Sequence, residues 1–316
     1  MRRTLVALTA LTLGLAAACT ASTPTAASSP PSTVSSRPSA ASSAPKPVAH
    51  PTSSVASQAA AAGRHRFRFG HVVVVVEENH SYGQIIGNSD APYMNALARH
   101  GMLFTRSYAI THPSEPNYIA MFSGSTHGVT SDACPVTIRS NNLGAQLRAA
   151  GLRFDGYSQS LPSTGSTVCT DGAYARKHVP WTDFPDLPGS VNKPFGSFPS
   201  NYTKLPAVSF VIPDLDHDMH DGTIAQADTW LHRKVGGYAH WARRHRSLLI
   251  VTWDEASDGS AVNRIPTIAY GAGVRAEKYR YRVDHYRLLR TLEKIYGLGA
   301  LGTAAHRKPI RNLVGS

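Results

Sequence analysis

The sequence predicts an α/β fold in which a largely parallel sheet is covered by helices on both faces. Three observations predict it. Strand-like and helix-like segments alternate almost throughout residues 64–316. Residues 71–76 read His-Val-Val-Val-Val-Val, an unbroken β-branched run typical of a strand buried on both faces. Three such strands end in polar clusters, and open α/β sheets place their ligands at that edge.

The N-terminal residues are not expected to belong to this fold. Residues 1–19 have a basic start and a short apolar run, which predicts a secretory signal peptide and is too short for a membrane-spanning helix. The run ends at Cys19 in a segment that resembles a bacterial lipobox, so Cys19 is the expected lipidation site. Residues 20–63 are Ala, Ser, Thr and Pro with almost nothing to bury, and we expect a disordered tether. Residues 64–316 form the predicted catalytic domain of an exported protein.

Helices and strands follow in order along residues 64–316. Glycines and prolines at their ends mark most of the boundaries. After the strand at 71–76, the expected helices are 92–100, 142–150, 227–244 and 284–296. The further expected strands are 154–158, 208–212, 247–253 and 266–270. Residues 158–205 are rich in Pro, Gly and Ser, which predicts a long excursion over the active-site edge.

Charge and cysteine content limit the partners and the compartment. The formal charge is +12, and four basic residues but no acid precede Arg64, so residues 64–316 carry +8. Such a surface favours phosphate esters, anionic lipid or nucleic acid. No P-loop, dinucleotide fingerprint or zinc finger is present, which disfavours a nucleotide-binding or DNA-reading protein. Cys134 and Cys169 are an even pair in an exported protein, and we expect a disulfide between them.

Residues 111–124 predict a catalytic serine at the start of a helix. Pro116 suits a first helical turn, and an apolar helix follows that stops at Gly124. Ser114 then lies just before the helix N-terminus, where free N–H groups and the dipole favour an attacking alkoxide and a bound phosphate. The alternative is a serine that merely caps the helix.

The three polar strand ends predict a bound cation. They are residues 77–79, 214–221 and 254–255, and they are rich in carboxylates although the chain as a whole is basic. Oxygen ligands with histidine suit a divalent metal. Solvated loops that cap the next helices are the alternative for each cluster. Lys177 and His178 belong either to a phosphate site or to an ordinary surface.

Five motifs in order resemble one family. They are Glu-Asn at 78–79, His-Pro-Ser-x-Pro-Asn-Tyr at 112–118, Lys-His-x-Pro at 177–180, Asp-Met-His-Asp at 218–221 and Trp-Asp-Glu at 253–255. The chain resembles the bacterial phosphoesterases of the acid phosphatase and phospholipase C type, within the alkaline-phosphatase-like superfamily. The resemblance spans residues 69–298 and implies a three-layer fold. Within the family it is closer to secreted mycobacterial members that act on phosphatidylinositol 3-phosphate.

The resemblance also implies the roles of individual residues. Ser114 would be the nucleophile, and His220 or His178 would protonate the leaving alcohol. The implied substrate-binding residues are Asn117, Lys177, His178 and His220. The implied ligands of a divalent metal, whose identity stays open, are Glu78, Asn79, Asp254 and Glu255.

The leading hypothesis is an exported, metal-dependent acid phosphatase that works through a phosphoserine. Its expected partners are phosphate monoesters, including phosphoinositides at anionic membranes, with no nucleic acid and no transmembrane segment in the mature protein. A phospholipase C that cleaves a phosphodiester is the first alternative. A non-catalytic surface protein that binds anionic lipid is the second.

Overall fold

A computed structural model describes residues 68–257 and 260–314. The expectations for the signal peptide, for Cys19 and for the tether lie outside these residues. Within the described ranges, the helices are all too short or too polar to cross a membrane.

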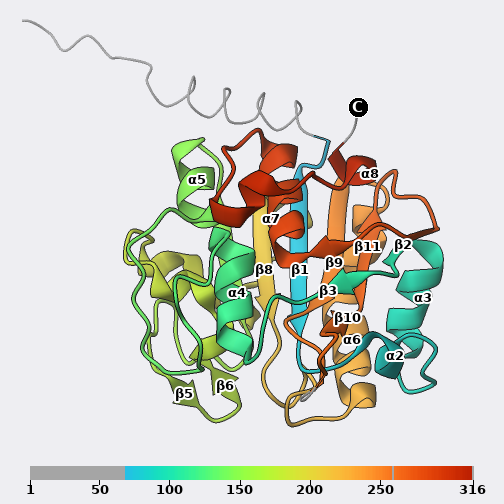
Figure 1. The fold of residues 1–316 in the computed structure, drawn as a ribbon, viewed down its shortest axis with the longest axis horizontal. Helices are drawn as coiled ribbons and strands as arrows, with labels where there is room; N and C mark the ends of the chain where they lie inside the picture. The colour runs from blue at the N-terminus through green and yellow to red at the C-terminus, as the bar shows by residue number, and fades with distance from the viewer. Residues whose placement is uncertain (1–67, 258–259, 315–316) are drawn as a thin grey trace, which may run out of the picture. The chain divides into compact units, whose positions relative to one another are not determined.

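One mixed sheet organises the fold, and β1 (His71–Glu77) lies inside it (Figure 1). β1 pairs in parallel with β9 (Ser247–Trp253) on one side and β8 (Val208–Ile212) on the other. Beyond β8 lie β4 (Phe154–Ser158) and β7 (Asn192–Pro194). Beyond β9 lie β11 (Thr267–Gly271), β2 (Met102–Phe104) and β12 (Glu277–Tyr279). Among the described strands of this sheet, β11 alone runs against the others, so the largely parallel sheet is confirmed.

Helices cover both faces of the sheet, and a hydrophobic core lies between the sheet and each helical layer. Because successive side chains of a strand point to opposite faces, alternate valines of β1 enter these two cores. Val72, Val74 and Val76 pack in the core shared with α4 (Ser114–Ser123), α5 (Leu143–Ala149), α7 (His285–Tyr296) and α8 (Arg311–Val314). Val73 and Val75 pack in the core shared with α2 (Tyr82–Ile85), α3 (Pro92–His100) and α6 (Ile224–Ala242). Figure 1 shows α4 and α7 in front of the sheet. The predicted helix–sheet–helix layering is confirmed.

The long elements lie close to their predicted ranges. Strands 154–158, 208–212 and 247–253 and helix 92–100 match at both ends. α6 begins at Ile224, three residues before the predicted start, because Thr223 and Gln226 form a capping box there. The sequence did not predict the short strands, which have only two or three residues each and, except for the β5–β6 pair, partners that are distant in the chain. Besides β2, β7 and β12 these are β3 (Ser107–Tyr108), β5 (Thr170–Asp171), β6 (Tyr174–Ala175), β10 (Arg264–Ile265) and β13 (Val283–Asp284).

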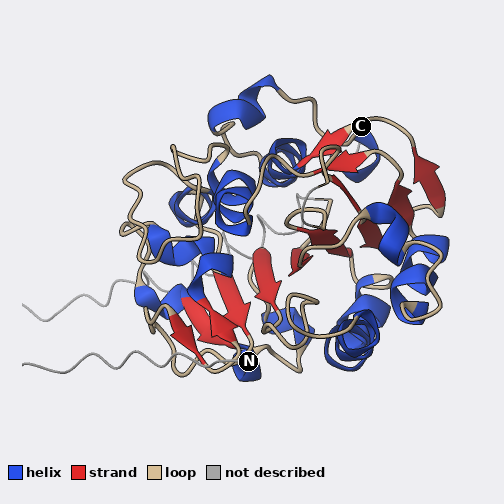
Figure 2. Cartoon of the chain, turned by 60° about the horizontal axis from the view of Figure 1, so that its bottom comes forward, coloured by secondary structure: helices blue, strands red, loops and turns tan. Residues whose placement is uncertain are grey.

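The excursion between β4 and β8 carries the small β5–β6 hairpin and several short 3-10 turns. These turns are Arg176–His178, Pro180–Asp183, Gly189–Val191, Phe195–Ser197 and Tyr202–Lys204. A further turn, Gly302–His306, precedes α8. β5 and β6 lie at the bottom of Figure 1, where β1 also ends, and Figure 2 brings this side of the molecule forward. The excursion therefore reaches the carboxyl edge of the sheet.

Candidate active site

The structure brings the three predicted polar strand ends together. β9, β1 and β8 are adjacent and parallel, so their carboxyl ends meet at one edge. The Asn79 backbone N–H donates to Asp254 Oδ1 at 3.1 Å, and the Glu78 N–H donates to the Asp218 carbonyl at 2.8 Å. Glu78, Asp218 and Asp254 are all fully buried. Buried carboxylates this close together require a compensating partner.

Ser114 faces this acidic cluster. It is the first residue of α4, one position later in the helix than predicted, and Pro113 is the N-cap. Its Oγ donates to Glu78 Oε2 at 3.0 Å, and the side chain is 2% exposed. The N-cap residue makes no side-chain capping bond, and it is Asp132 Oδ1 that accepts from the Glu115 N–H, at 3.0 Å, in the first turn of α4. These contacts disfavour the alternative that Ser114 is only a helix cap.

Asn117 holds the segment before Ser114. Its Oδ1 accepts from the N–H groups of Ile110 and Thr111 at 2.9 and 3.0 Å. Its Nδ2 donates to the carbonyls of Thr111 and Pro113 at 2.9 and 3.0 Å. All four hydrogen-bonding positions of the amide are thereby engaged. In the structure this amide holds the turn before Ser114, and the predicted role of Asn117 in substrate binding stays a prediction.

Tyr118 and His178 complete the wall around Glu78. The Tyr118 hydroxyl donates to Glu78 Oε1, and its ring stacks on the His178 ring with centroids 5.2 Å apart. His178 Nε2 lies 3.2 Å from Glu78 Oε1, and Nδ1 lies 3.4 Å from Asp218 Oδ2. Sequence reasoning did not single out Tyr118 or Asp218. Tyr118 lies one helical turn after Ser114, and that i, i+4 spacing could have indicated it.

His178 and its two carboxylates fit a cation. Burial lowers the pKa of His178 to about 3, and burial raises the pKa of Glu78 well above its usual range. A neutral imidazole has one N–H, so at least one of its two nitrogens turns a lone pair toward a carboxylate. His178 Nε2 and Asp218 Oδ2 are both buried without a hydrogen-bond partner among the described residues. Ligand atoms of Glu78, His178 and Asp218 all lie within 4.8 Å of one another. A divalent cation between them would satisfy the remaining lone pairs.

The predicted ligands form a second donor set that shares Glu78. Asn79 Oδ1 and Asp254 Oδ2 are buried without a hydrogen-bond partner among the described residues. Buried polar atoms normally have partners, so these two orphaned oxygens favour an ion. Glu255 differs from the other predicted ligands, because its Oε2 lies 2.6 Å from His112 Nδ1. Glu78, Asn79 and Asp254 offer oxygen donors that suit a cation, and the assignment of the four residues as metal ligands stays a prediction.

Lys177 and His220 form the mouth of the site. Their side chains are 21% and 29% exposed, in contrast with the buried cluster beneath them. Lys177 Nζ lies 2.9 Å from Asp132 Oδ2 and 3.3 Å from His220 Nε2, while His220 Nδ1 lies 2.6 Å from Asp221 Oδ1. The ring centroids of His220 and the buried His178 are 5.9 Å apart, so these partly exposed groups lie next to the cluster.

An unusual backbone conformation separates His220 from the buried cluster. Met219 has φ 81°, a left-handed conformation that costs a non-glycine residue on the order of 1–3 kcal/mol. The turn directs the Asp218 carboxylate inward, and Asp218 Oδ1 also accepts from the His220 N–H at 2.7 Å. The strained Met219 thus lies between the buried Asp218 and the partly exposed His220, two residues that point to different parts of the site.

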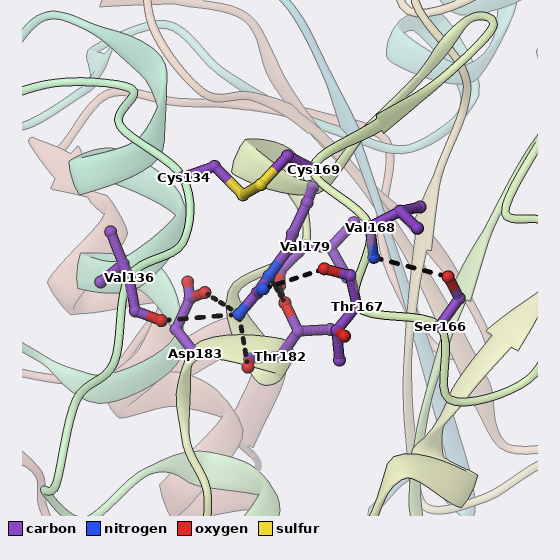
Figure 3. The surroundings of a disulfide bond; sticks show 10 residues. Cys134, Val136, Ser166, Thr167, Val168, Cys169, Val179, Thr182 and Asp183 are labelled. Carbon is purple, nitrogen blue, oxygen red and sulfur yellow. Dashed lines mark hydrogen bonds and ion pairs between the residues drawn. A yellow bond between two sulfur atoms is a disulfide. The ribbon is translucent and has the colours of Figure 1, made fainter. Parts of the chain in front are cut away.

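The predicted disulfide between Cys134 and Cys169 is confirmed (Figure 3). It joins the loop after α4 to the excursion. Arg176 reinforces this junction by donating to the carbonyls of Val136, Thr167 and Thr182. Asp132, which holds Lys177, lies two residues before Cys134. The disulfide therefore anchors the loop that positions Lys177.

Replacement of both cysteines by serine is expected to destabilise the fold. The two residues are 35 apart in sequence, and a loop of that size predicts a loss of about 3–4 kcal/mol in the loop-entropy model. Urea unfolding of the purified variant measures the loss. An unchanged unfolding midpoint would show that other contacts already restrain this loop.

Comparison with known proteins places the chain in context. Residues 88–299 match the family described as the Phosphoesterase family. The chain is 52% identical over 250 residues to a phosphatidylinositol-3-phosphatase of Mycobacterium tuberculosis, covering 78% of this chain and 83% of that protein. It is 28% identical over 233 residues to an acid phosphatase of Aspergillus fumigatus, covering 66% of this chain and about half, 51%, of that relative.

Solved structures agree on the fold. A phosphonate monoester hydrolase of Agrobacterium radiobacter superposes with a TM-score of 0.54 at 14% identity, covering 76% of this chain and 78% of that chain. A protein of the alkaline phosphatase superfamily from Vibrio parahaemolyticus gives a TM-score of 0.51 at 14% identity, with 76% and 70% covered. At these identities the likeness shows the architecture, and it confirms the predicted alkaline-phosphatase-like fold.

Proposed function

The chain belongs to the phosphoesterase family and is a phosphatase, and from that premise we propose that it is an acid phosphatase with Ser114 as its nucleophile. One observation carries this proposal. Ser114 Oγ lies at the start of α4 and donates to Glu78 Oε2 at 3.0 Å, inside a buried cluster of carboxylates and His178. Serine at a helix N-terminus meets both needs of phosphoryl transfer, because the same N–H groups favour the alkoxide and the phosphate.

The residues divide the reaction between them. The hydrogen bond to Glu78 fixes the direction of Ser114 Oγ, which attacks phosphorus in line. A P–O bond to Ser114 forms while the P–O bond to the alcohol breaks, and water then hydrolyses the phosphoserine. Lys177 lies at the mouth, where its ammonium attracts the phosphate. A divalent cation held by Glu78, Asn79 and Asp254 would polarise the phosphoryl oxygens and lower the pKa of the serine hydroxyl.

The two histidines take different parts in this proposal. His220 is partly exposed, with Nδ1 2.6 Å from Asp221 Oδ1 and Nε2 3.3 Å from Lys177 Nζ. A leaving alcohol bound beside Lys177 would lie within reach of this Nε2, which suits His220 for general acid catalysis. His178 is buried, and both of its ring nitrogens face carboxylates. His178 therefore has no nitrogen directed at a leaving group. We assign the proton transfer to His220. The proposed role of His178 is to hold the carboxylates of Glu78 and Asp218 in place.

An assay on a chromogenic phosphate monoester tests the activity. Turnover that vanadate inhibits is the expected result, because vanadate mimics the pentacoordinate phosphorus. The phospholipase C alternative predicts diacylglycerol from lipid instead of inorganic phosphate. The non-catalytic alternative predicts no turnover of any phosphate ester.

The substrate proposal rests on the Mycobacterium tuberculosis relative, which is named for phosphatidylinositol 3-phosphate. We extend that class of substrate to this chain, whose residues 64–316 carry a formal charge of +8. Export is part of the same proposal, since a disulfide persists in oxidising compartments. Lipid attachment at Cys19 would hold the enzyme at a membrane surface.

Salt is expected to affect a membrane substrate far more than a soluble one. Each basic residue near an anionic surface contributes about 1 kcal/mol, and salt screens this attraction beyond roughly 8 Å at physiological ionic strength. Rates on vesicles that contain phosphatidylinositol 3-phosphate should fall steeply between low and high salt. Rates on a soluble phosphate ester should fall little. Equal salt dependence on the two substrates would indicate a general phosphatase.

A further inference from the structure

A large basic cleft lies apart from the residues that surround Ser114. It has a volume of about 1170 Å³. Three segments line it: residues 277–282 of β12 and the following turn, Asp284 and Arg287 at the start of α7, and residues 306–309 with 311–312 before and within α8. Its walls hold seven Lys or Arg side chains and two carboxylates. None of these residues belongs to the site described above.

The two carboxylates of the basic cleft are already engaged. Asp284 Oδ1 caps α7 by accepting the Arg287 N–H at 2.8 Å, and Oδ2 accepts from Arg307 Nε at 2.9 Å. Glu277 Oε1 accepts from the Asn312 amide. One ion pair, Asp284 with Arg307, therefore neutralises one of the seven basic groups.

The remaining basic groups keep their charge. Arg287 donates to the Arg282 carbonyl at 2.6 Å and to the Tyr279 hydroxyl at 2.9 Å, and both acceptors are neutral. Lys278, Arg280, Lys308 and Arg311 are exposed, and within the described ranges the structure gives their side chains no ion pair or hydrogen bond. Like charges gathered on a concave wall repel one another and focus a positive field. An anionic partner would relieve that repulsion.

The rim of the basic cleft indicates what kind of anion it meets. Tyr281 is 71% exposed and lies between Arg280 and Arg282. Tyrosine beside arginine is typical of residues that lie at the interface between a membrane and water. A single-stranded nucleic acid would instead favour several exposed aromatic platforms along a groove. Tyr279, the other tyrosine of the cleft, is buried.

We infer that the basic cleft is a second anion-binding site that docks the protein on the phosphate headgroups of an anionic bilayer. This binding needs no turnover at Ser114. It can therefore be measured with vesicles that hold no substrate, so a failure of the docking site and a failure of the proposed phosphatase activity are separable.

The test is binding of the full chain to vesicles of phosphatidylcholine with and without phosphatidylserine. Arg280→Glu with Lys308→Glu is the cleft variant, since neither side chain holds other described residues in place. Lys204→Glu with Lys234→Glu is the matched control, because both lysines are exposed, lie outside the cleft and change the net charge equally. All variants carry the same residues 1–67, so any contribution of that segment cancels.

The cleft variant is expected to bind phosphatidylserine vesicles at least about tenfold more weakly, because each basic residue near the surface accounts for about a fivefold change. The control should change less than about threefold, and both variants should keep wild-type kcat on a soluble phosphate ester. Tyr281→Ala should weaken binding to vesicles while leaving any binding of a duplex oligonucleotide or of inorganic phosphate unchanged.

Several results would overturn the inference. Equal losses in the cleft and control variants would assign lipid binding to the general positive charge. Oligonucleotide binding as tight as vesicle binding, with no effect of Tyr281→Ala, would make the basic cleft a nucleic-acid surface. Occupation of the cleft by inorganic phosphate, without any lowered vesicle binding in the cleft variant, would make it a site for free phosphate.

Discussion

Replacing Ser114 with alanine is expected to lower kcat at least about 1000-fold while the fold persists, as for other nucleophile deletions. The reason is the loss of the one oxygen that is placed to attack phosphorus. The substitution also removes the hydrogen bond from Ser114 Oγ to Glu78, whose carboxylate keeps the Tyr118 contact. Unfolding free energy should therefore change by no more than about 1–2 kcal/mol. Steady-state kinetics and urea unfolding measure the two effects separately.

The same helix offers a matched control. Ser123 is equally buried, and its Oγ donates to the Ile119 carbonyl at 2.8 Å, away from the acidic cluster. Ser123→Ala should keep wild-type kcat with a comparable loss of stability. If Ser114→Ala retained more than a few per cent of wild-type kcat, another residue would be the nucleophile.

Asp254→Asn is expected to remove most of the bound metal and to lower kcat about 100-fold. Asp254 Oδ2 is buried and has no hydrogen-bond partner among the described residues, so loss of its charge weakens a cation site directly. A cation at 100 times its Kd stabilises the fold by about 2.7 kcal/mol. Wild-type protein should therefore lose Tm when a chelator is added, and Asp254→Asn should lose much less. Metal analysis and thermal unfolding with and without chelator provide the measurements.

Asp228→Asn is the control for a buried carboxylate. Asp228 is also buried, but it caps α3 by accepting the N–H groups of Tyr93 and Met94. It should leave metal content and the chelator effect unchanged. Full metal occupancy in Asp254→Asn, together with wild-type turnover, would show that Asp254 is not a metal ligand and only orients Asn79.

Short sequence patterns were enough to predict much of the fold. The β-branched run of β1 is buried along its whole length, as such a run predicts for a strand between two helical layers. α7 begins after its N-cap Asp284 and ends at Gly297, whose φ of 68° is the left-handed conformation that glycine favours. These features depend on neighbours a few residues away, and so they are visible in the sequence. The helix start at Pro116 and the polar strand ends already indicated Ser114 and a cation, and the resemblance to a family added the roles of the individual residues.

Tertiary structure alone decided the rest of the site. Asp214, Asp216, Asp218 and Asp221 are alike in sequence, yet the chain turns at Met219 so that Asp218 is the one beside His178 and Glu78. Asn117 lies in the same motif as Ser114, but the turn before α4 uses its entire amide. His178 reaches Glu78 from a point 100 residues along the chain. Burial and orientation of a polar side chain depend on what packs against it from elsewhere, and that packing has no local pattern to reveal it.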